Sequence, residues 1–161
     1  MNLHLGYLPG CIGRIAEMHA TYYARTAGFG APFEAKVATE LSEFCVRYAQ
    51  GRDGLWLAID GSVIHGSVAI DGSGVRESGA HLRWFIASDE SRGKGVGALM
   101  LSAALAFCTA KAYRKVYLWT FDELHAARHL YEKNGFKLSR TQRGAQWSKE
   151  VNEQLFTLGD E

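Results

Sequence analysis

The sequence has almost no net charge, no long apolar run and no basic leader, and each absence excludes a class of protein. Its 161 residues carry 18 Lys and Arg against 17 Asp and Glu, a formal net charge of +1. No overall field therefore favours nucleic acid or an anionic membrane. No stretch reaches the ~20 apolar residues of a membrane span. The N-terminus has no basic segment followed by an apolar one, so no secretory signal is expected.

The sequence is also poor in cysteine. Cys11, Cys45 and Cys108 are odd in number and show no C-x-x-C spacing, which favours neither a disulfide framework nor a zinc site. All three fall in apolar helical patterns, where free thiols are usually buried. We therefore expect a cytoplasmic protein with reduced cysteines and no bound metal.

What is present is typical of one globular domain spanning residues 1–161, with 47% hydrophobic and 22% charged residues. Apolar side chains recur at helical spacing over about 11–27 and 33–48. The period then changes, and strands are expected over 55–60, 62–71 and 80–87, the first two joined at Asp60-Gly61 as a hairpin. Sequential strands of this kind form an antiparallel meander.

The second half of the chain alternates helices and strands. An alanine-rich helix over 97–113 precedes a strand over 115–120, which gives a βαβ crossover and a parallel strand pair. A helix over 122–136 and strands over 136–141 and 151–158 follow. We expect a mixed α/β (α+β) fold: one sheet with antiparallel N-terminal strands, a central βαβ crossover and helices on both faces.

The stretch R-G-K-G-V-G at 92–97 lies directly before the alanine-rich helix. Alternating glycines let a backbone approach a ligand closely, and a helix start offers unpaired N–H groups to an anion. The P-loop pattern G-x-x-x-x-G-K-[ST] is missing. A looser match to G-x-G-x-x-[GA] leaves a nucleotide-dependent oxidoreductase as an alternative, but the loop follows a meander instead of opening a βαβ unit. A simple tight turn is the other alternative.

Two separated motifs resemble those of the GCN5-related N-acetyltransferases (GNAT). The first is R-x-x-G-x-G, carried by Arg92, Gly95 and Gly97. The second is A-x-x-L-Y-x-x-x-G-F, which begins at Ala127 and includes Tyr131. The order of expected elements is similar to that of the family across nearly the whole chain.

The stretches 118–136 and 146–154 most resemble acetyltransferase modules fused behind MarR-type regulators. The chain begins directly at the acetyltransferase, so no DNA-binding winged helix is expected.

The resemblance implies an enzyme that moves an acetyl group from acetyl-CoA to a primary amine by direct attack in a ternary complex. It also implies a coenzyme A site with two parts. The pantetheine arm would lie along Phe85, Ile86 and Ala87, and the pyrophosphate would lie on the loop made of Arg92, Gly93, Lys94, Gly95, Val96, Gly97 and Ala98. A non-catalytic acyl-CoA sensor or regulatory module with the same pocket is the alternative function.

Tyr131 is the implied general acid, because a phenol can donate a proton to the leaving thiolate. The alternative is that it only packs beneath Phe136. One position departs from the family pattern: Leu124 stands where an asparagine is common, so a contact to the cofactor arm is either missing or made elsewhere, with Asp122 as a candidate.

The base is open between His81, Glu77 and loss of the proton to water. Strict alternation along the strand places His81, Arg83 and Phe85 on one face of the sheet and Leu82 with Trp84 on the other.

The acceptor side is implied to involve the first two helices and the loop between the last two strands. Glu17, Tyr22 and Trp147 are the candidate substrate-binding residues there, with His19, Tyr23 and Glu150 also available. Carboxylates and aromatic rings together can hold an amine cation. The acceptor itself, a small-molecule or peptide amine, is not identified by the sequence, and pairing into a homodimer is left open.

Overall fold

The computed structural model describes residues 1–159 and contains one seven-stranded sheet in the order β1-β2-β3-β4-β5-β7-β6. The strands are β1 (Asn2–Leu5), β2 (Gly54–Asp60), β3 (Val63–Asp71), β4 (Ala80–Ala87), β5 (Lys115–Phe121), β6 (Lys137–Gly144) and β7 (Val151–Gly159). Every neighbouring pair is antiparallel except β4 and β5, which are parallel. The expected meander and crossover are confirmed.

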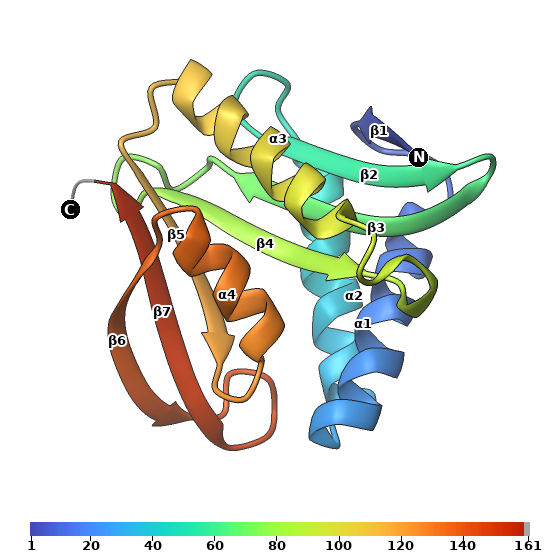
Figure 1. Cartoon of the computed structure of the whole chain (residues 1–161), viewed down its shortest axis with the longest axis vertical. Helices are drawn as coiled ribbons and strands as arrows, with labels where there is room; N and C mark the ends of the chain where they lie inside the picture. The colour runs from blue at the N-terminus through green and yellow to red at the C-terminus, as the bar shows by residue number, and fades with distance from the viewer. Residues whose placement is uncertain (160–161) are drawn as a thin grey trace.

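Helices cover both faces of the sheet, as expected (Figure 1). Helices α1 (Cys11–Ala27) and α2 (Ala31–Val46) pack on one face, and α3 (Val96–Ala110) and α4 (His125–Lys133) on the other. A short 3-10 turn, η1 (Asp89–Ser91), precedes α3.

The sequence pattern of β2 explains why two cores form. Successive side chains of a strand point to opposite faces. Leu55 and Leu57 accordingly pack against α1 and α2, whereas Trp56 and Ala58 pack against α3. A strand buried on both faces is apolar without alternation, and that is how this segment reads.

The sheet opens in its middle, where β4 and β5 diverge (Figure 1). Only Ala80 pairs with Val116 and His81 with Tyr117, whereas β5 pairs with β7 over seven residue positions. Beyond His81, no residue of β4 pairs with β5 within residues 1–159, so this edge of β4 is open. The candidate site lies beside this gap.

A β-bulge at Trp84 interrupts β4. Ala69 pairs with Arg83 but Ser67 pairs with Ile86, so β4 contains one extra residue between these pairs. Trp84 takes the left-handed conformation, with φ at 49°. The buried Ser67 hydroxyl donates a 2.6 Å hydrogen bond to the Trp84 carbonyl, which supports the extra residue in this uncommon conformation.

The bulge changes which face each side chain of β4 occupies. Trp84 packs in the core beneath α1 and α2, and Phe85 packs against the core on the α3 side together with Leu82. The expectation that His81, Arg83 and Phe85 share one face and that Leu82 and Trp84 share the other is therefore wrong. Strict alternation fails because the extra residue inverts the pattern after Arg83.

Two features of the sheet were not predicted from the sequence. One is the four-residue edge strand β1, and the other is the position of β7 between β5 and β6.

The three cysteine thiols are free, and those of Cys11 and Cys108 are buried. Within residues 1–159, no helix has the length and apolarity needed to cross a membrane.

Candidate active site

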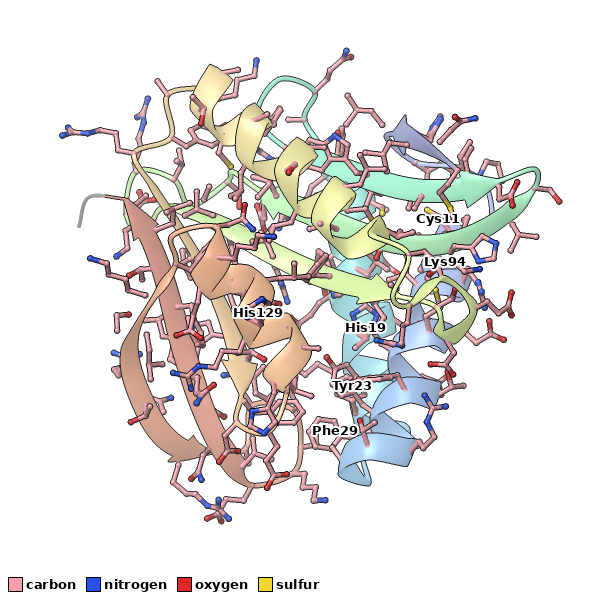
Figure 2. The ribbon with its side chains drawn as sticks, in the orientation of Figure 1. Cys11, His19, Tyr23, Phe29, Lys94 and His129 are labelled. Carbon is pink, nitrogen blue, oxygen red and sulfur yellow. The ribbon has the colours of Figure 1, made fainter. Side chains whose placement is uncertain are left out.

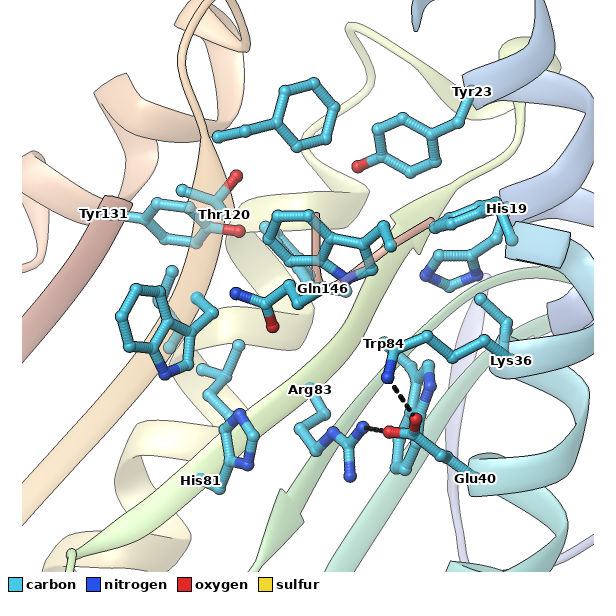
Figure 3. Close-up of a pocket in the computed structure, with 18 residues that line it drawn as sticks. His19, Tyr23, Lys36, Glu40, His81, Arg83, Trp84, Thr120, Tyr131 and Gln146 are labelled. Atoms are coloured by element: carbon cyan, nitrogen blue, oxygen red, sulfur yellow. Dashed lines mark hydrogen bonds and ion pairs between the residues drawn. The ribbon is translucent and has the colours of Figure 1, made fainter. Parts of the chain in front are cut away.

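A pocket of about 140 Å³ lies beside the gap between β4 and β5. Its lining comes from α1, α2, β4, β5, α4 and the loop that joins β6 to β7 (Figure 3). The lining residues are His19, Tyr23, Phe33, Lys36, Val37, Glu40, His81, Leu82, Arg83, Trp84, Phe85, Leu118, Trp119, Thr120, Phe121, Tyr131, Gln146 and Trp147.

The C-terminal end of α4 fixes Tyr131. Gly135 has φ at 94°, and its N–H donates to the Glu132 carbonyl while the Phe136 N–H donates to the Tyr131 carbonyl. These two bonds form the Schellman motif that glycine at C′ permits. The Tyr131 ring then packs against Phe136 and Phe85, each at 5.9 Å between ring centroids.

Tyr131 is buried, with 6% of its surface exposed, and its hydroxyl points into the pocket (Figure 3). Burial raises the pKa of Tyr131 far above its ordinary value, and the nearby Tyr23 adds to that rise. The phenol is therefore protonated at every physiological pH.

The glycine loop leads into α3 with open space around it. Gly93 and Gly95 have φ at 75° and 78°, and a Cβ added at either would meet no atom within 4 Å. No hydrogen bond from the N–H groups of Val96, Gly97 or Ala98 is seen within residues 1–159. The loop therefore presents consecutive free backbone donors at the positive end of a helix dipole.

Gly97 has a different role in the same loop. A Cβ at this position would lie 3.3 Å from Leu130 and 3.4 Å from Phe85. This glycine lets the first turn of α3 approach both β4 and α4.

The two cations of the loop are used differently. The Arg92 guanidinium donates to Asp89 at 3.1 Å and lies 4.1 Å from the Tyr22 ring centroid. Arg25 pairs with the same carboxylate at 2.9 Å. The Arg92 side chain thus links the loop to α1, whereas Lys94 is exposed and makes no ion pair within residues 1–159. Figure 2 shows Lys94 on the loop.

A second, smaller hollow of about 120 Å³ lies next to this link. Tyr22, Ala87 and Arg92 are among its lining residues. Ile86, by contrast, is buried against α1 and α2.

The two candidate bases occupy different environments. Glu77 is exposed in the loop between β3 and β4 and does not line the pocket. His81 lines the pocket and stacks on Tyr117, with ring centroids 4.4 Å apart. Burial, assisted by the positive charge of Arg83, lowers the pKa of His81 to about 3. The imidazole is therefore neutral at pH 7 and weakly basic.

His19 is a second neutral imidazole in the pocket. Its Nδ1 lies 2.8 Å from the Ile15 carbonyl oxygen. Because a carbonyl only accepts, Nδ1 carries the proton and Nε2 keeps its lone pair. Burial lowers the pKa of His19 to about 4. Figure 2 shows His19 and Tyr23 projecting from α1 toward the centre of the molecule.

Three charged side chains form one end of the pocket (Figure 3). The Glu40 carboxylate pairs with Arg83 through Oε1 and with Lys36 through Oε2, the latter at 2.6 Å. Burial alone would raise the pKa of Glu40, but the hydrogen bonds from Lys36 and Arg83 hold it below its ordinary value.

Aromatic rings close the opposite side. Tyr23 contacts Phe33 at 5.4 Å and Phe121 at 5.7 Å, and Phe121 contacts Trp147 at 5.6 Å, all between ring centroids. The loop that carries Trp147 is organised by the buried Glu153, whose carboxylate accepts hydrogen bonds from the Gln146 N–H and the Gln142 side chain at 2.9 Å each.

The loop is also tied to α1, because the Lys149 ammonium donates to the Ala27 carbonyl. The structure brings together Tyr131, His81, His19, Tyr23 and Trp147.

Other predicted residues lie elsewhere. Glu17 is exposed and pairs with Arg14 at 2.6 Å, and Glu150 is exposed and pairs with Arg143. Tyr22 lines the smaller hollow. Asp122 accepts a hydrogen bond from Asn152, and Leu124 packs against the core beneath α1 and α2.

Sequence reasoning missed Lys36, Glu40 and Arg83 as pocket residues. The i,i+4 spacing of Lys36 and Glu40 on α2 was a signal that two charges lie on one helix face.

Fold and site together define a class: a mixed α/β protein with unpaired N–H groups at a helix start and a pocket beside an open sheet edge. Residues 16–136, three quarters of the chain, match the model described as the acetyltransferase (GNAT) family. The chain therefore belongs to the GNAT family of acetyltransferases. No curated protein matches it in sequence.

Solved structures share the fold over almost the entire chain. A GNAT-family acetyltransferase from Staphylococcus aureus is 14% identical, with a TM-score of 0.74, and 98% of this chain and 99% of that one are covered. A GNAT-family acetyltransferase from Elizabethkingia anophelis with acetyl-CoA bound is 14% identical, with a TM-score of 0.71 and coverage of 99% and 97%. The spermidine N-acetyltransferase SpeG from Vibrio cholerae is 19% identical, with a TM-score of 0.71 and coverage of 99% and 95%.

Proposed function

We propose that this protein transfers an acetyl group from acetyl-CoA to a primary amine in a ternary complex. The observation that carries the proposal is the row of free N–H groups at the start of α3, next to an open sheet edge that leads into a pocket containing Tyr131. The donors suit a pyrophosphate, the open edge suits an extended arm, and the pocket suits a small acceptor.

The residues present fit acetyl-CoA. Gly93 and Gly95 leave the space that phosphate oxygens need, and the N–H groups of residues 96–98 are available to bind them. Lys94 adds a positive charge that forms no ion pair within residues 1–159. The edge of β4 from Phe85 to Ala87 offers backbone groups that can pair with an amide-containing chain in the manner of an added strand. When bound, acetyl-CoA supplies an activated thioester.

The chain's own groups then act on three atoms. A backbone N–H on the free edge near Phe85–Ala87 stabilises the negative charge that develops on the carbonyl oxygen. The bond between the amine nitrogen and the carbonyl carbon forms, and the carbon–sulfur bond breaks. Tyr131 donates its proton to the departing sulfur, and the proton that the newly bonded nitrogen releases reaches the Tyr131 oxygen through water, so that the phenol, whose pKa is raised by burial, is restored.

The amine must lose a proton before it attacks, because a free ammonium has a pKa near ~10. His81 and His19 have pKa values of about 3 and about 4, so each accepts a hydrogen bond but is too weak a base to take this proton fully. Glu77 lies outside the pocket. We therefore propose that the proton leaves through water, with the histidines orienting the amine.

The experiment that tests this function is a thermal melt of the purified protein with acetyl-CoA, CoA, NADH or no ligand. Ligand at 100 times its Kd adds about 2.7 kcal/mol to the free energy of unfolding. We expect acetyl-CoA and CoA, but not NADH, to raise the melting temperature. Acetylation of a panel of primary amines is then scored by thiol release. A protein that no CoA species stabilises would contradict the proposal.

The finer expectations from the sequence also stand as proposals. These are closer kinship with modules fused to MarR-type regulators, action as a single domain over residues 1–161, and a cytoplasmic location without nucleic-acid or membrane partners. Sedimentation measurements test whether the chain also forms a homodimer.

A further inference from the structure

The charged end of the pocket has one more positive than negative charge. Lys36 and Arg83 are its cations, and Glu40 is the only carboxylate that lines it within residues 1–159. Both oxygens of Glu40 are engaged, one by each cation. A substrate that carries a second ammonium group, such as a polyamine, would therefore find that the Glu40 carboxylate is already neutralised. The excess positive charge of the pocket would repel that second ammonium group.

Arg83 is held rigidly while most of its donors are free. Its Nη2 donates to Glu40, and its guanidinium carbon lies 4.2 Å from the Trp84 ring centroid. Its side chain is 22% exposed. The Nε and Nη1 groups donate to no acceptor within residues 1–159. Because one Nη2 donor is used by Glu40, one edge of the guanidinium keeps two available donors, and this edge matches the geometry of a carboxylate bound through paired hydrogen bonds.

The remaining titratable groups of the pocket do not change this balance at pH 7. His19 and His81 are neutral, because burial keeps their pKa values at about 4 and about 3. Burial likewise raises the pKa of Tyr23 and Tyr131, so both phenols keep their protons.

The charges and the aromatic lining together identify a class of acceptor. Resting on the acetyl transfer proposed above, we propose that the acceptor is a small amino carboxylate, such as a free amino acid with an apolar side chain. Arg83 binds its carboxylate, the rings of Trp84, Phe33 and Trp147 contact its apolar part, and its amine lies toward Tyr131. A polyamine, the kind of substrate named for SpeG, lacks the anionic group that this pocket would bind.

The test compares matched compounds that differ only at the carboxylate: L-phenylalanine, its amide and phenethylamine, and L-leucine with its amide and the corresponding amine. Spermidine is included as a polyamine for comparison. We expect kcat/KM for the acid to exceed that for its amide by about 10- to 100-fold, since a charge-assisted hydrogen bond contributes about 1.5–3 kcal/mol. Arg83→Gln should abolish this preference by lowering only the value for the acid. Arg83→Lys, which keeps the positive charge but lacks the planar guanidinium, should retain part of the preference for the acid.

Arg76→Gln is the matched control, because Arg76 is exposed outside the pocket. It should leave the preference unchanged. If no compound is acetylated, calorimetric binding of the same pairs to the CoA-saturated protein measures the preference without turnover. Equal binding or equal turnover of acid and amide, absence of acid binding, or a preference that survives in Arg83→Gln would overturn the inference. Failure of acetyl-CoA itself to raise the melting temperature would instead contradict the proposed function, so the two failures are distinguishable.

Discussion

At the scale of single residues, Tyr131 combines a fixed ring with a hydroxyl that points into the pocket. Tyr131→Phe removes the oxygen and keeps the packing against Phe85 and Phe136. We expect kcat to fall about 100-fold, the lower range for loss of a positioned proton donor, with the melting shift caused by acetyl-CoA unchanged. Tyr7→Phe, at an exposed tyrosine, should change neither. Full activity in Tyr131→Phe would limit this residue to packing.

His19 makes stability depend on pH. Its pKa of about 4 in the folded state lies below the 6.5 of an exposed histidine. The unfolded chain therefore takes up a proton first as pH falls, so stability is fully present above pH 6.5 and is lost progressively down to about pH 4. The difference amounts to about 3 kcal/mol.

Chemical denaturation between pH 7.5 and 4.5 measures this effect. His19→Gln should reduce the dependence of unfolding free energy on pH, and His129→Gln, at an exposed position on α4, should not. An unchanged slope in His19→Gln would show that His19 is not a neutral buried group.

Individual pocket residues were predictable only where a motif marked them. Tyr131 follows from the A-x-x-L-Y pattern, and its position at the helix end follows from Gly135. Arg83 and Trp84 were assigned by strict alternation, and the bulge overrides that rule. Nothing local in "HLRWF" indicates an extra residue, because the bulge depends on pairing with β3 and on the buried Ser67 hydroxyl.

At the scale of elements, alanine substitutions at two comparable glycines test whether the loop before α3 binds phosphate or is an ordinary turn. Gly95 and Gly61 both have positive φ, at 78° and 61°, and a Cβ at either would meet no atom within 4 Å. Alanine at either position costs about 1–2 kcal/mol in backbone strain. We expect Gly95→Ala alone to weaken acetyl-CoA binding, measured by calorimetry, because only its Cβ would enter the proposed phosphate site. Equal affinity in both variants would argue against phosphate binding at this loop.

Element boundaries were predicted well where hydrophobic periodicity was long. The first helix and the strand at 80–87 have the expected bounds. The edge strand β1 was missed because four residues carry too little pattern. The insertion of β7 between β5 and β6 could not be read from spacing, since strand order depends on contacts distant in sequence.

At the scale of the whole molecule, the two parts of the sheet are joined by few strand–strand bonds. Because β4 and β5 pair at only two positions, a ligand in the gap should protect amides on both facing edges. We expect hydrogen exchange within residues 82–87 to slow on addition of acetyl-CoA, while amides of β2 and β3 stay unchanged. Unaltered exchange at saturating acetyl-CoA would place the ligand outside the gap.

The fold class was predictable because both motifs and the order of elements agreed across the chain. The depth and charge of the pocket were not, since they arise only when α2, β4 and the β6–β7 loop meet.

The aromatic content of the pocket has a practical consequence. Of the four tryptophans in the chain, Trp84, Trp119 and Trp147 line the pocket, whereas Trp56 lies in the core beneath α3. Intrinsic fluorescence excited near the red edge of indole absorption thus comes mostly from tryptophans that line this pocket. A ligand in this pocket would lie beside three of the four tryptophans, so an unlabelled fluorescence titration would measure occupancy of the pocket separately from turnover.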